Sequence, residues 1–371
     1  MRIVVVGGGI TGALTAYFLV RLGADVTLVE RDRIGGQASG HNPGGLNPLH
    51  GAGIPGPLEE LALASFRLHH EHWEHVQRLS RIDFEPRRRP RLHVAMDEGD
   101  VAGLERTREP YDATAGFAAR WVPADEMRAI EPRLDDGVAG GLWTEGNAKV
   151  DAARYTRAAA KAAVELGART LTGEVRGLDG PPGRVTGVRL DGGALRCDGV
   201  VLATGPWCAE PARWLGTTLP VEPLRGEMLL AELDTRGTEV DLAWREAAVY
   251  GTGGRRVWLG GTADRAGFDA APSAAARASI LERVSRILPG TGHARVVRQT
   301  AALRPVTPDG MPIVGRPAGW ENACLALGSG RKGMLLSAGI GLAVAELLVR
   351  GDTTMPIGAC APERWAAPAP R

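Results

Sequence analysis

Residues 1–30 read MRIVVVGGGITGALTAYFLVRLGADVTLVE. The apolar run Ile3 to Val6 is typical of a buried parallel strand, and three glycines follow it with the spacing G-x-G-x-x-G. In this motif Gly7 allows a tight turn, Gly9 lets a pyrophosphate approach the backbone, and Gly12 lets the helix pack closely on the strand. The helix amides and the positive end of the helix dipole then stabilise the phosphate charge. The segment therefore predicts a strand, turn and helix that bind a dinucleotide.

The second strand of this unit, Val26 to Val29, ends at the carboxylate of Glu30. A carboxylate about 20 residues after the glycines can accept hydrogen bonds from both ribose hydroxyls of an adenosine. It would repel a 2′-phosphate, so the sequence disfavours NADP. NAD and FAD both remain open from these residues alone.

Length and charge narrow the class of protein. A chain of 371 residues is expected to form two domains, because single cores stop growing near ~250–300 residues. The net charge of +1 indicates neither a nucleic acid partner nor an anionic membrane. The one basic run, Arg87-Arg88-Arg89-Pro90-Arg91, has no interleaved aromatic residues, so we expect a solvated strand edge that leads into Leu92-His93-Val94.

Cysteine spacing and hydropathy indicate a reduced protein without a metal. Cys197, Cys208, Cys324 and Cys360 form no C-x-x-C pair, so we expect structural thiols and no metal site. The first apolar stretch is too short for a signal peptide, which favours a cytoplasmic protein. The long apolar segment 333–349 contains Glu346 and falls short of ~20 residues, so it predicts a buried helix and not a membrane span.

Further strand and helix patterns recur along the chain. A β-hairpin is predicted over 185–190 and 194–197, with Asp191-Gly192-Gly193 as its turn, before a buried strand that ends at Gly205. Helices are expected over 151–166 and 273–288, and a mostly antiparallel sheet over 221–230 and 247–262. The nucleotide-binding domain is thus assembled from separated segments.

Several motifs in the same order along the whole chain resemble the FAD-dependent D-amino acid oxidase family, most closely its glycine oxidase branch and more distantly the monomeric sarcosine oxidases. They are Gly7 to Glu30, Gly35 to Gly40 with Gly44 to Pro48, Val200 to Trp207, Leu224 to Met228, Gly260 to Thr262, Leu303 to Gly315 and Gly328 to Leu335. The resemblance implies FAD as the cofactor. It also implies an α/β fold with a Rossmann-type FAD-binding domain and a second, α+β substrate domain on a mostly antiparallel sheet.

The resemblance implies a discontinuous FAD-binding domain over 1–83, 143–222 and 296–371, with the substrate domain over 84–142 and 223–295. The FAD-binding residues that it implies are Gly7, Gly9, Ile10, Thr11, Gly12, Glu30, Arg31, Ala38, Ser39, Gly44, Gly45, Leu46, Val175, Ala203, Thr204, Gly205, Trp207, Arg304, Gly330, Arg331, Lys332, Gly333, Met334 and Leu335. The last six begin a helix whose N-terminal amides would face the pyrimidine side of the flavin.

The resemblance also implies the substrate residues. Arg304 of the Leu-Arg-Pro motif would hold the substrate carboxylate with a bidentate guanidinium fork. Tyr250 would give the same carboxylate a hydroxyl, and Arg331 would lie near the flavin and the mouth of the pocket. The histidines His41 and His50, beside the expected flavin loop, are interpreted as structural.

The position of the flavin-linking cysteine of monomeric sarcosine oxidases is Ala302 here, so noncovalent FAD is expected. The implied reaction is oxidation of glycine, a D-amino acid or an N-alkyl amino acid, with hydride transfer to the flavin, an imine that hydrolyses, and oxygen as acceptor. Three alternatives remain: a dehydrogenase with a quinone or protein acceptor, oxidation of a 2-hydroxy acid, or a flavin subunit of a larger complex. An oligomer is compatible with each.

Overall fold

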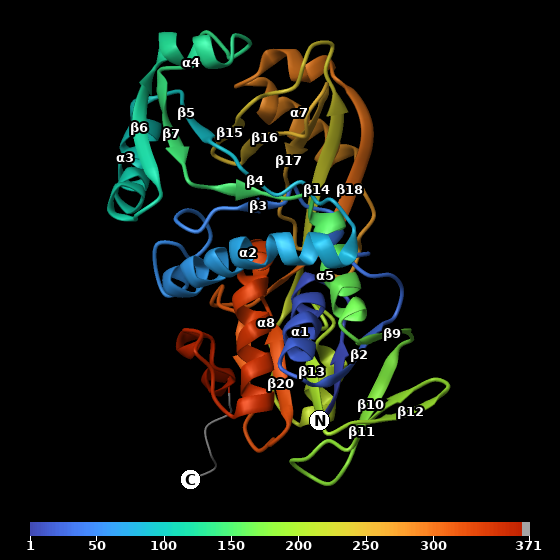
Figure 1. Ribbon diagram of the computed structural model, residues 1–371. Helices are drawn as coiled ribbons and strands as arrows, with labels where there is room; N and C mark the ends of the chain where they lie inside the picture. Colours follow the sequence, from blue (N-terminus) through green and yellow to red (C-terminus); the bar gives the residue numbers. More distant parts are fainter. Residues whose placement is uncertain (366–371) are drawn as a thin grey trace, which may run out of the picture.

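A computed structural model describes residues 1–365 and contains two large sheets, one in each half of the molecule (Figure 1). The first is a six-stranded sheet with the order β19-β20-β13-β1-β2-β9. Its strands are β1 (Arg2–Val6), β2 (Asp25–Glu30), β9 (Arg169–Thr172), β13 (Gly199–Leu202), β19 (Ile313–Gly315) and β20 (Ala323–Leu327). All neighbours are parallel except β19 and β20, which are antiparallel.

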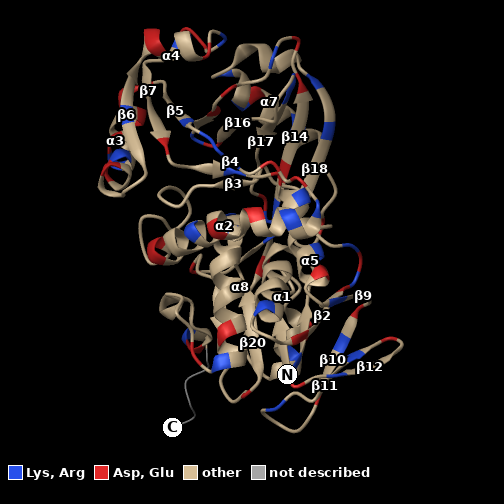
Figure 2. Ribbon diagram, in the orientation of Figure 1, with Lys and Arg blue, Asp and Glu red and all other residues tan. Residues whose placement is uncertain are grey.

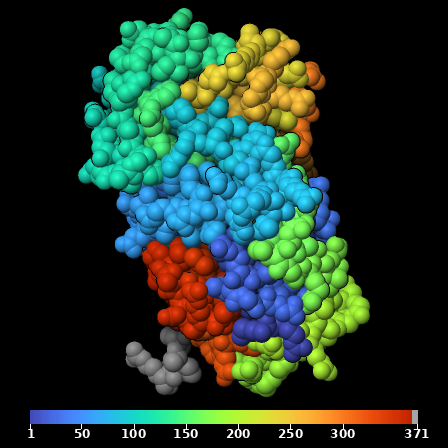
Figure 3. Space-filling view, viewed as in Figure 1, coloured from blue at the N-terminus to red at the C-terminus, as the bar shows by residue number. Residues whose placement is uncertain are grey.

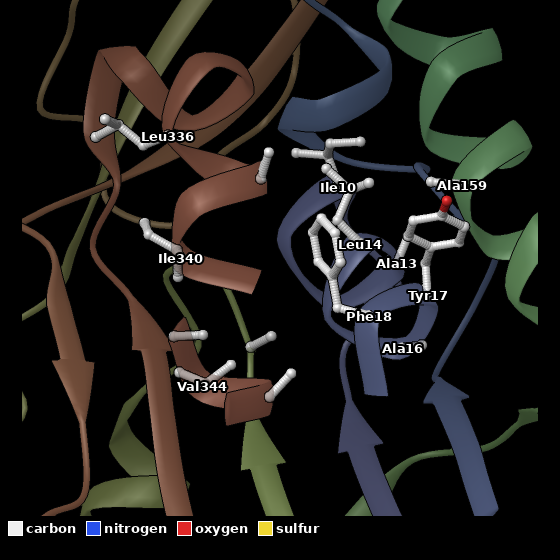
Figure 4. Packing of buried hydrophobic residues seen from close by; sticks show 14 of the residues in the cluster. Ile10, Ala13, Leu14, Ala16, Tyr17, Phe18, Ala159, Leu336, Ile340 and Val344 are labelled. Carbon is white, nitrogen blue, oxygen red and sulfur yellow. The ribbon is translucent and has the colours of Figure 1, made fainter. Parts of the chain in front are cut away.

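Helices α1 (Ile10–Arg21), α5 (Ala152–Glu165) and α8 (Gly333–Arg350) cover one face of this sheet. Figure 4 shows Leu14 and Phe18 on the side of α1 toward α8, and Tyr17 on the side toward α5. The two helices approach closely at Gly341, where a Cβ would lie 3.0 Å from the backbone nitrogen of Thr15. Helix α2 (Glu59–Ser80) lies across this layer, at the junction with the other half (Figures 1 and 3).

Alternation along β1 gives this sheet two apolar faces. Ile3 and Val5 join the cluster beneath the helices, whereas Val4 and Val6 join a second cluster on the opposite face. That face is covered by the antiparallel meander β10 (Val175–Asp179), β11 (Gly187–Leu190) and β12 (Gly193–Arg196) and by helix α6 (Ala209–Leu215). The predicted hairpin and the helices α5 and α8 are confirmed.

The second half is an eight-stranded, mostly antiparallel sheet with the order β18-β14-β17-β16-β15-β5-β7-β6. Its strands are β5 (Arg91–Ala95), β6 (Ala118–Pro123), β7 (Gly140–Glu145), β14 (Glu222–Glu232), β15 (Asp241–Trp244), β16 (Ala247–Gly251), β17 (Arg256–Gly260) and β18 (Arg295–Val306). Helix α7 (Ala274–Ser285) packs on one face of it, and α3 (Glu98–Ala113) and α4 (Ala124–Ile130) pack near β5 to β7. A small sheet of β3 (Gly45–Leu46), β8 (Ala148–Lys149) and β4 (Arg87–Arg88) lies between the halves (Figure 1). The expected fold class is confirmed.

Two strands pair with strands on the other side of the expected domain boundaries. Strand β18 was placed with 296–371, yet it pairs with β14 from Glu222 opposite Val306 to Glu232 opposite Arg295. The end of β7 was placed with 143–222, yet it pairs with β5 and β6. Strand patterns identify a strand but not its partner, so these two pairings could not be derived from sequence. The domain boundaries themselves stay a prediction.

The interpretation of the basic run as a solvated strand edge is wrong for two of its arginines. The Arg89 side chain is 12% exposed and its Nε lies 2.8 Å from the carboxylate of Asp241. Arg91 opens β5, which lies between β15 and β7 and not at an edge. Elsewhere acidic and basic residues are interspersed over both halves (Figure 2).

The four cysteines are unpaired and buried, as expected for structural thiols. Burial raises the pKa of the Cys208 thiol to about 12, so it is not a thiolate at neutral pH. Within residues 1–365, one helical segment, Gly330–Arg350, is long and apolar enough to cross a membrane, and 72% of its apolar stretch is buried inside the protein.

A buried carboxyl group ties α7 to the edge of the large sheet. Glu227 of β14 is 0% exposed. Its carboxylate accepts hydrogen bonds from the backbone nitrogen and the hydroxyl of Ser273, both at 2.9 Å, and from Nε2 of Gln299 at 2.7 Å. Ser273 is also the N-cap of α7. One side chain therefore joins β14, β18 and the start of a helix.

We expect Glu227→Ala to lower the free energy of unfolding by about 3 kcal/mol, because it leaves several buried donors without an acceptor. Urea unfolding followed by circular dichroism measures the change. The matched control is Glu321→Ala, whose partner Arg184 is also at the surface, with side chains 70% and 57% exposed. The control should cost less than ~1 kcal/mol. Equal losses in the two variants would contradict the anchoring role of Glu227.

Candidate active site

A cleft of roughly 620 Å³ lies between the two sheets and collects most of the expected site residues. From the expected set it is lined by Gly7, Gly9, Ile10, Thr11, Glu30, Arg31, Ala38, Ser39, Gly45, Val175, Ala203, Thr204, Gly205, Trp207, Tyr250, Arg304 and Gly330 to Leu335. Gly12, Gly44 and Leu46 lie behind the wall and do not line it. One cleft therefore contains residues of both the N-terminal glycine motif and the Leu-Arg-Pro motif.

At one end, the glycine turn brings the chain close to the end of β13. Gly7 has φ +111°, and a Cβ there would lie 2.3 Å from the carbonyl oxygen of Ala203. A Cβ on Gly12 would lie 1.9 Å from the carbonyl oxygen of Gly7. These contacts explain why both positions require glycine. The first turn of α1 then opens onto the cleft with amides that have no partner within the helix.

Two side chains shape this end of the cleft. The Ser39 hydroxyl accepts a hydrogen bond from the backbone nitrogen of Ile10 at 3.0 Å, which fixes the loop 38–40 over the start of α1. The carboxylate of Glu30 accepts from the backbone nitrogens of Gly8 at 2.6 Å and Asp32 at 3.1 Å. Its position at the carboxyl end of β2 is the one expected for a ribose contact.

At the other end, one face of the eight-stranded sheet forms the wall. Along β16, Val249 packs in the hydrophobic cluster beneath α7, whereas Ala248 and Tyr250 point the other way and line the cleft. The same alternation brings Arg304 of β18 to the cleft beside Gly226 of β14.

The guanidinium of Arg304 is fixed by backbone on two sides. Its Nη1 donates to the carbonyl oxygen of Thr262 at 2.9 Å. A Cβ on Gly226 would lie 2.0 Å from that same nitrogen, so the glycine makes room for the guanidinium. Burial, and then the nearby charge of Arg331, lower the pKa of Arg304 to about 10, which leaves it protonated at neutral pH. It therefore presents a fixed positive charge with further donors for a carboxylate.

Lys332 joins the start of α8 to the chain beside β3. Its Nζ donates to the carbonyl oxygens of Asn47, at 2.9 Å, and of His50. Burial, and then the charges of Arg91 and Arg331, lower the pKa of Lys332 to about 7. Arg331 itself is exposed. The amine of Lys332 thus changes charge within the physiological range of pH, and a neighbouring anion would favour its protonated form.

The two histidines near the flavin loop carry no charge at neutral pH. Burial lowers the pKa of His50 to about 4, and its ring packs edge-on against His93 with centroids 5.0 Å apart. His41 contacts the carbonyl oxygen of Gly36 at 3.2 Å, and burial lowers its pKa as well. Their packing fits the structural interpretation of both side chains.

Asn47, Gly226 and Arg91 are among the residues that line the cleft without having been expected as site residues. Asn47 and Gly226 lie within motifs that carry the family resemblance, so the sequence around them could have identified them as site residues. Arg91 gave no such signal, because its place depends on the pairing of β5 with β15, about 150 residues away in the chain.

This combination of a glycine-turn cradle and a facing antiparallel sheet defines a two-domain, nucleotide-dependent oxidoreductase. The family described as FAD dependent oxidoreductase matches residues 2–347, and the chain belongs to that family. The cradle at Gly7 and Gly12, the N-terminal end of α1 and Glu30 fit an FAD pyrophosphate and ribose. FAD, and not NAD, is therefore the cofactor of this cleft.

Relatives with curated names agree with this assignment. The chain is 31% identical to a glycine oxidase of Pseudomonas aeruginosa, with 94% of each chain covered. It is 30% identical to a D-amino acid dehydrogenase of Xanthobacter autotrophicus, over 94% of this chain and 95% of the relative. The structure of glycine oxidase from Geobacillus kaustophilus superposes with a TM-score of 0.91 at 26% identity, covering 99% and 100% of the two chains.

We expect Gly12→Ala to remove most of the bound FAD, because the new methyl group would meet the carbonyl oxygen of Gly7 and push α1 away from the turn. The ratio of flavin to protein absorbance in the purified protein measures the loss. The control is Gly290→Ala, since a Cβ there meets nothing within 4 Å and the glycine has no positive φ. Full FAD content in the Gly12 variant would contradict the proposed cradle.

Proposed function

We propose that this protein oxidises the C–N bond of a small amino acid, either glycine, a D-amino acid or an N-alkyl amino acid, with noncovalent FAD. The observation that carries the proposal is the fixed guanidinium of Arg304 in the FAD cleft. The names of the relatives, glycine oxidase and D-amino acid dehydrogenase, support an amino acid as the substrate. Noncovalent binding is proposed because the candidate attachment position is the buried Ala302, which has no nucleophile.

In this mechanism Arg304 binds the substrate carboxylate and so fixes the position of the adjacent Cα. Bound FAD supplies the hydride acceptor. Tyr250, on the same wall, would contribute a hydroxyl, and it interacts electrostatically with both Arg304 and Arg91. The amine reacts in its neutral form, so no side-chain base is needed, and water hydrolyses the imine product. The chain's main contributions are orientation and a fixed positive charge.

The acceptor and setting are part of the proposal. We favour oxygen as the electron acceptor because some of the relatives are named glycine oxidase. A quinone or protein acceptor is the second candidate because other relatives, of similar identity, are named D-amino acid dehydrogenase. We place the protein in the cytoplasm. Hydroxy acid oxidation and a role as a flavin subunit are the remaining alternatives, which flavin reduction distinguishes.

The experiment that tests the reaction is anaerobic mixing of the FAD-loaded protein with glycine, sarcosine, D- and L-amino acids and 2-hydroxy acids, followed at about 450 nm. We expect an amino acid to bleach the flavin band. Recovery of the band in air with formation of peroxide supports oxygen as acceptor, and a band that stays bleached in air supports a dehydrogenase. Bleaching by hydroxy acids alone, or by none of the compounds, would contradict the proposal.

Replacing Arg304 tests the carboxylate contact. We expect Arg304→Ala to lower kcat/KM for the amino acid by the equivalent of ~2–5 kcal/mol, mostly through KM, because a charged hydrogen-bonded pair is lost. Arg304→Lys should recover only part, since an ammonium group cannot form the planar fork. Arg298→Ala, on the exposed part of the same strand, is the control. Steady-state kinetics that do not change in the Arg304 variants would remove this residue from the substrate site.

A further inference from the structure

A second arginine, Arg91, points into the substrate end of the cleft. It pairs along the backbone with Asp241 of β15 on one side and Thr144 of β7 on the other. The next residue, Leu92, is buried in the hydrophobic cluster on the far face of the sheet. Because side chains alternate along a strand, Arg91 lies on the same face as Tyr250 and Arg304. All three residues line the cleft.

Within residues 1–365, the guanidinium of Arg91 has no carboxylate partner within 4.0 Å, and its Nε is buried without a hydrogen-bond acceptor. The carboxylate of Asp241 is taken by Arg89 at 2.8 Å, with Lys149 at 3.8 Å. The nearest aromatic neighbour is Tyr250, whose ring centroid lies 5.6 Å from Cζ of Arg91. The Tyr250 hydroxyl and the Asp241 carboxylate stabilise the charge of Arg91. The buried Nε of this half-buried arginine is nevertheless left without an acceptor.

The surroundings of Arg91 add positive charge and no free carboxylate. Lys149 lies 5.4 Å from the ring centroid of the same tyrosine, and Lys332 is close enough that Arg91 depresses its pKa. His50 and His93 are uncharged, because burial and then Arg91 lower both pKa values.

The acidic residues that line the cleft are engaged elsewhere. Glu30 accepts from backbone amides at the nucleotide end, and Glu174, Glu210 and Glu246 pair with Arg176, Arg213 and Arg283. A substrate with one carboxylate would occupy Arg304 and leave Arg91 unpaired. A buried donor without an acceptor is costly, so the site as built favours a ligand with a second negative group.

We propose that the substrate carries a second carboxylate, which Arg91 binds while Arg304 binds the carboxylate beside the reacting carbon. The substrate class is then an amino or imino dicarboxylate. This inference rests on the proposed function, and it adds a specificity residue to that site. The oxidation itself is unchanged: the C–H and C–N bonds that react are the same, and Arg91 forms no covalent bond.

Matched substrates isolate the second carboxylate. Iminodiacetate differs from sarcosine, and D-aspartate from D-asparagine, mainly in that group. We expect the wild-type protein to prefer the dicarboxylate of at least one pair by about 100-fold in kcat/KM, the size of a charge-assisted hydrogen-bonded contact. In Arg91→Met, which keeps an unbranched apolar stem but removes the charged group, that preference should fall to within about threefold, and the rate with the monocarboxylate should change little.

Two controls separate recognition from stability. Arg91→Lys should keep part of the preference, because it keeps the charge. Arg88→Met removes an exposed arginine of the same basic run outside the cleft and should leave the preference intact. Since Arg91 forms no ion pair within 4.0 Å in residues 1–365, Arg91→Met should also keep the wild-type melting temperature and FAD content. Equal kcat/KM within both substrate pairs in the wild type would overturn the inference while amino acid oxidation stands.

A binding measurement keeps the inference testable if no amino acid reduces the flavin. Malonate, succinate and glutarate are titrated against acetate, with the shift of the flavin absorbance as the readout. Tighter binding of at least one dicarboxylate than of acetate, lost in Arg91→Met, would support the second anion site even though the proposed function had failed. Equal affinities for the dicarboxylates and acetate would overturn it.

Discussion

The cleft depends on the close approach of the Gly7 turn to the end of β13. The backbone nitrogen of Ala203 donates to the carbonyl oxygen of Val6 at 2.8 Å, and that of Gly7 donates to Val29 at 2.8 Å. These two bonds bring the carboxyl ends of β1, β2 and β13 to one edge, and no side chain fits between the turn and Ala203. In a parallel sheet this edge is where ligands bind. The nucleotide end of the cleft follows from this backbone contact.

The substrate end depends on a different element, the long ribbon of β14 and β18. Thr262 donates its backbone nitrogen to the carbonyl oxygen of Glu227 at 3.1 Å, and its own carbonyl oxygen accepts from Arg304. The buried carboxylate of Glu227 in turn fixes this strand to α7. After Val306 the chain leaves the eight-stranded sheet and enters β19 of the other sheet. Arg304, the proposed substrate-binding residue, therefore lies where the two halves are joined.

Local patterns were sufficient for the first end of the cleft and for several separate elements. The glycine spacing, the apolar run and Glu30 lie within 30 residues, and each depends on its immediate neighbours. The position of Arg304 came from a motif shared with a family, and not from periodicity. Neither local patterns nor the family motifs identified Arg91. As part of an arginine-rich run it resembled a solvated edge, and only the pairing of β5 with β15 and β7 places it inside. The pairing of β18 with β14 likewise depends on contacts between segments far apart in the chain.

The two ends of the cleft differ in charge, and this difference determines which part of a ligand each end favours. Glu30 offers acceptors at the nucleotide end, whereas Arg304, Arg91 and Lys332 give the substrate end positive charge. A positive environment beside the start of α8 favours the anionic form of a reduced flavin. It also leaves more cationic charge than one carboxylate can neutralise. Lys332 is the sensitive element of this arrangement, because its pKa of about 7 reflects burial and the neighbouring arginines. A bound dianion would offset the arginines and raise that pKa, so binding of a dicarboxylate would be coupled to protonation of Lys332.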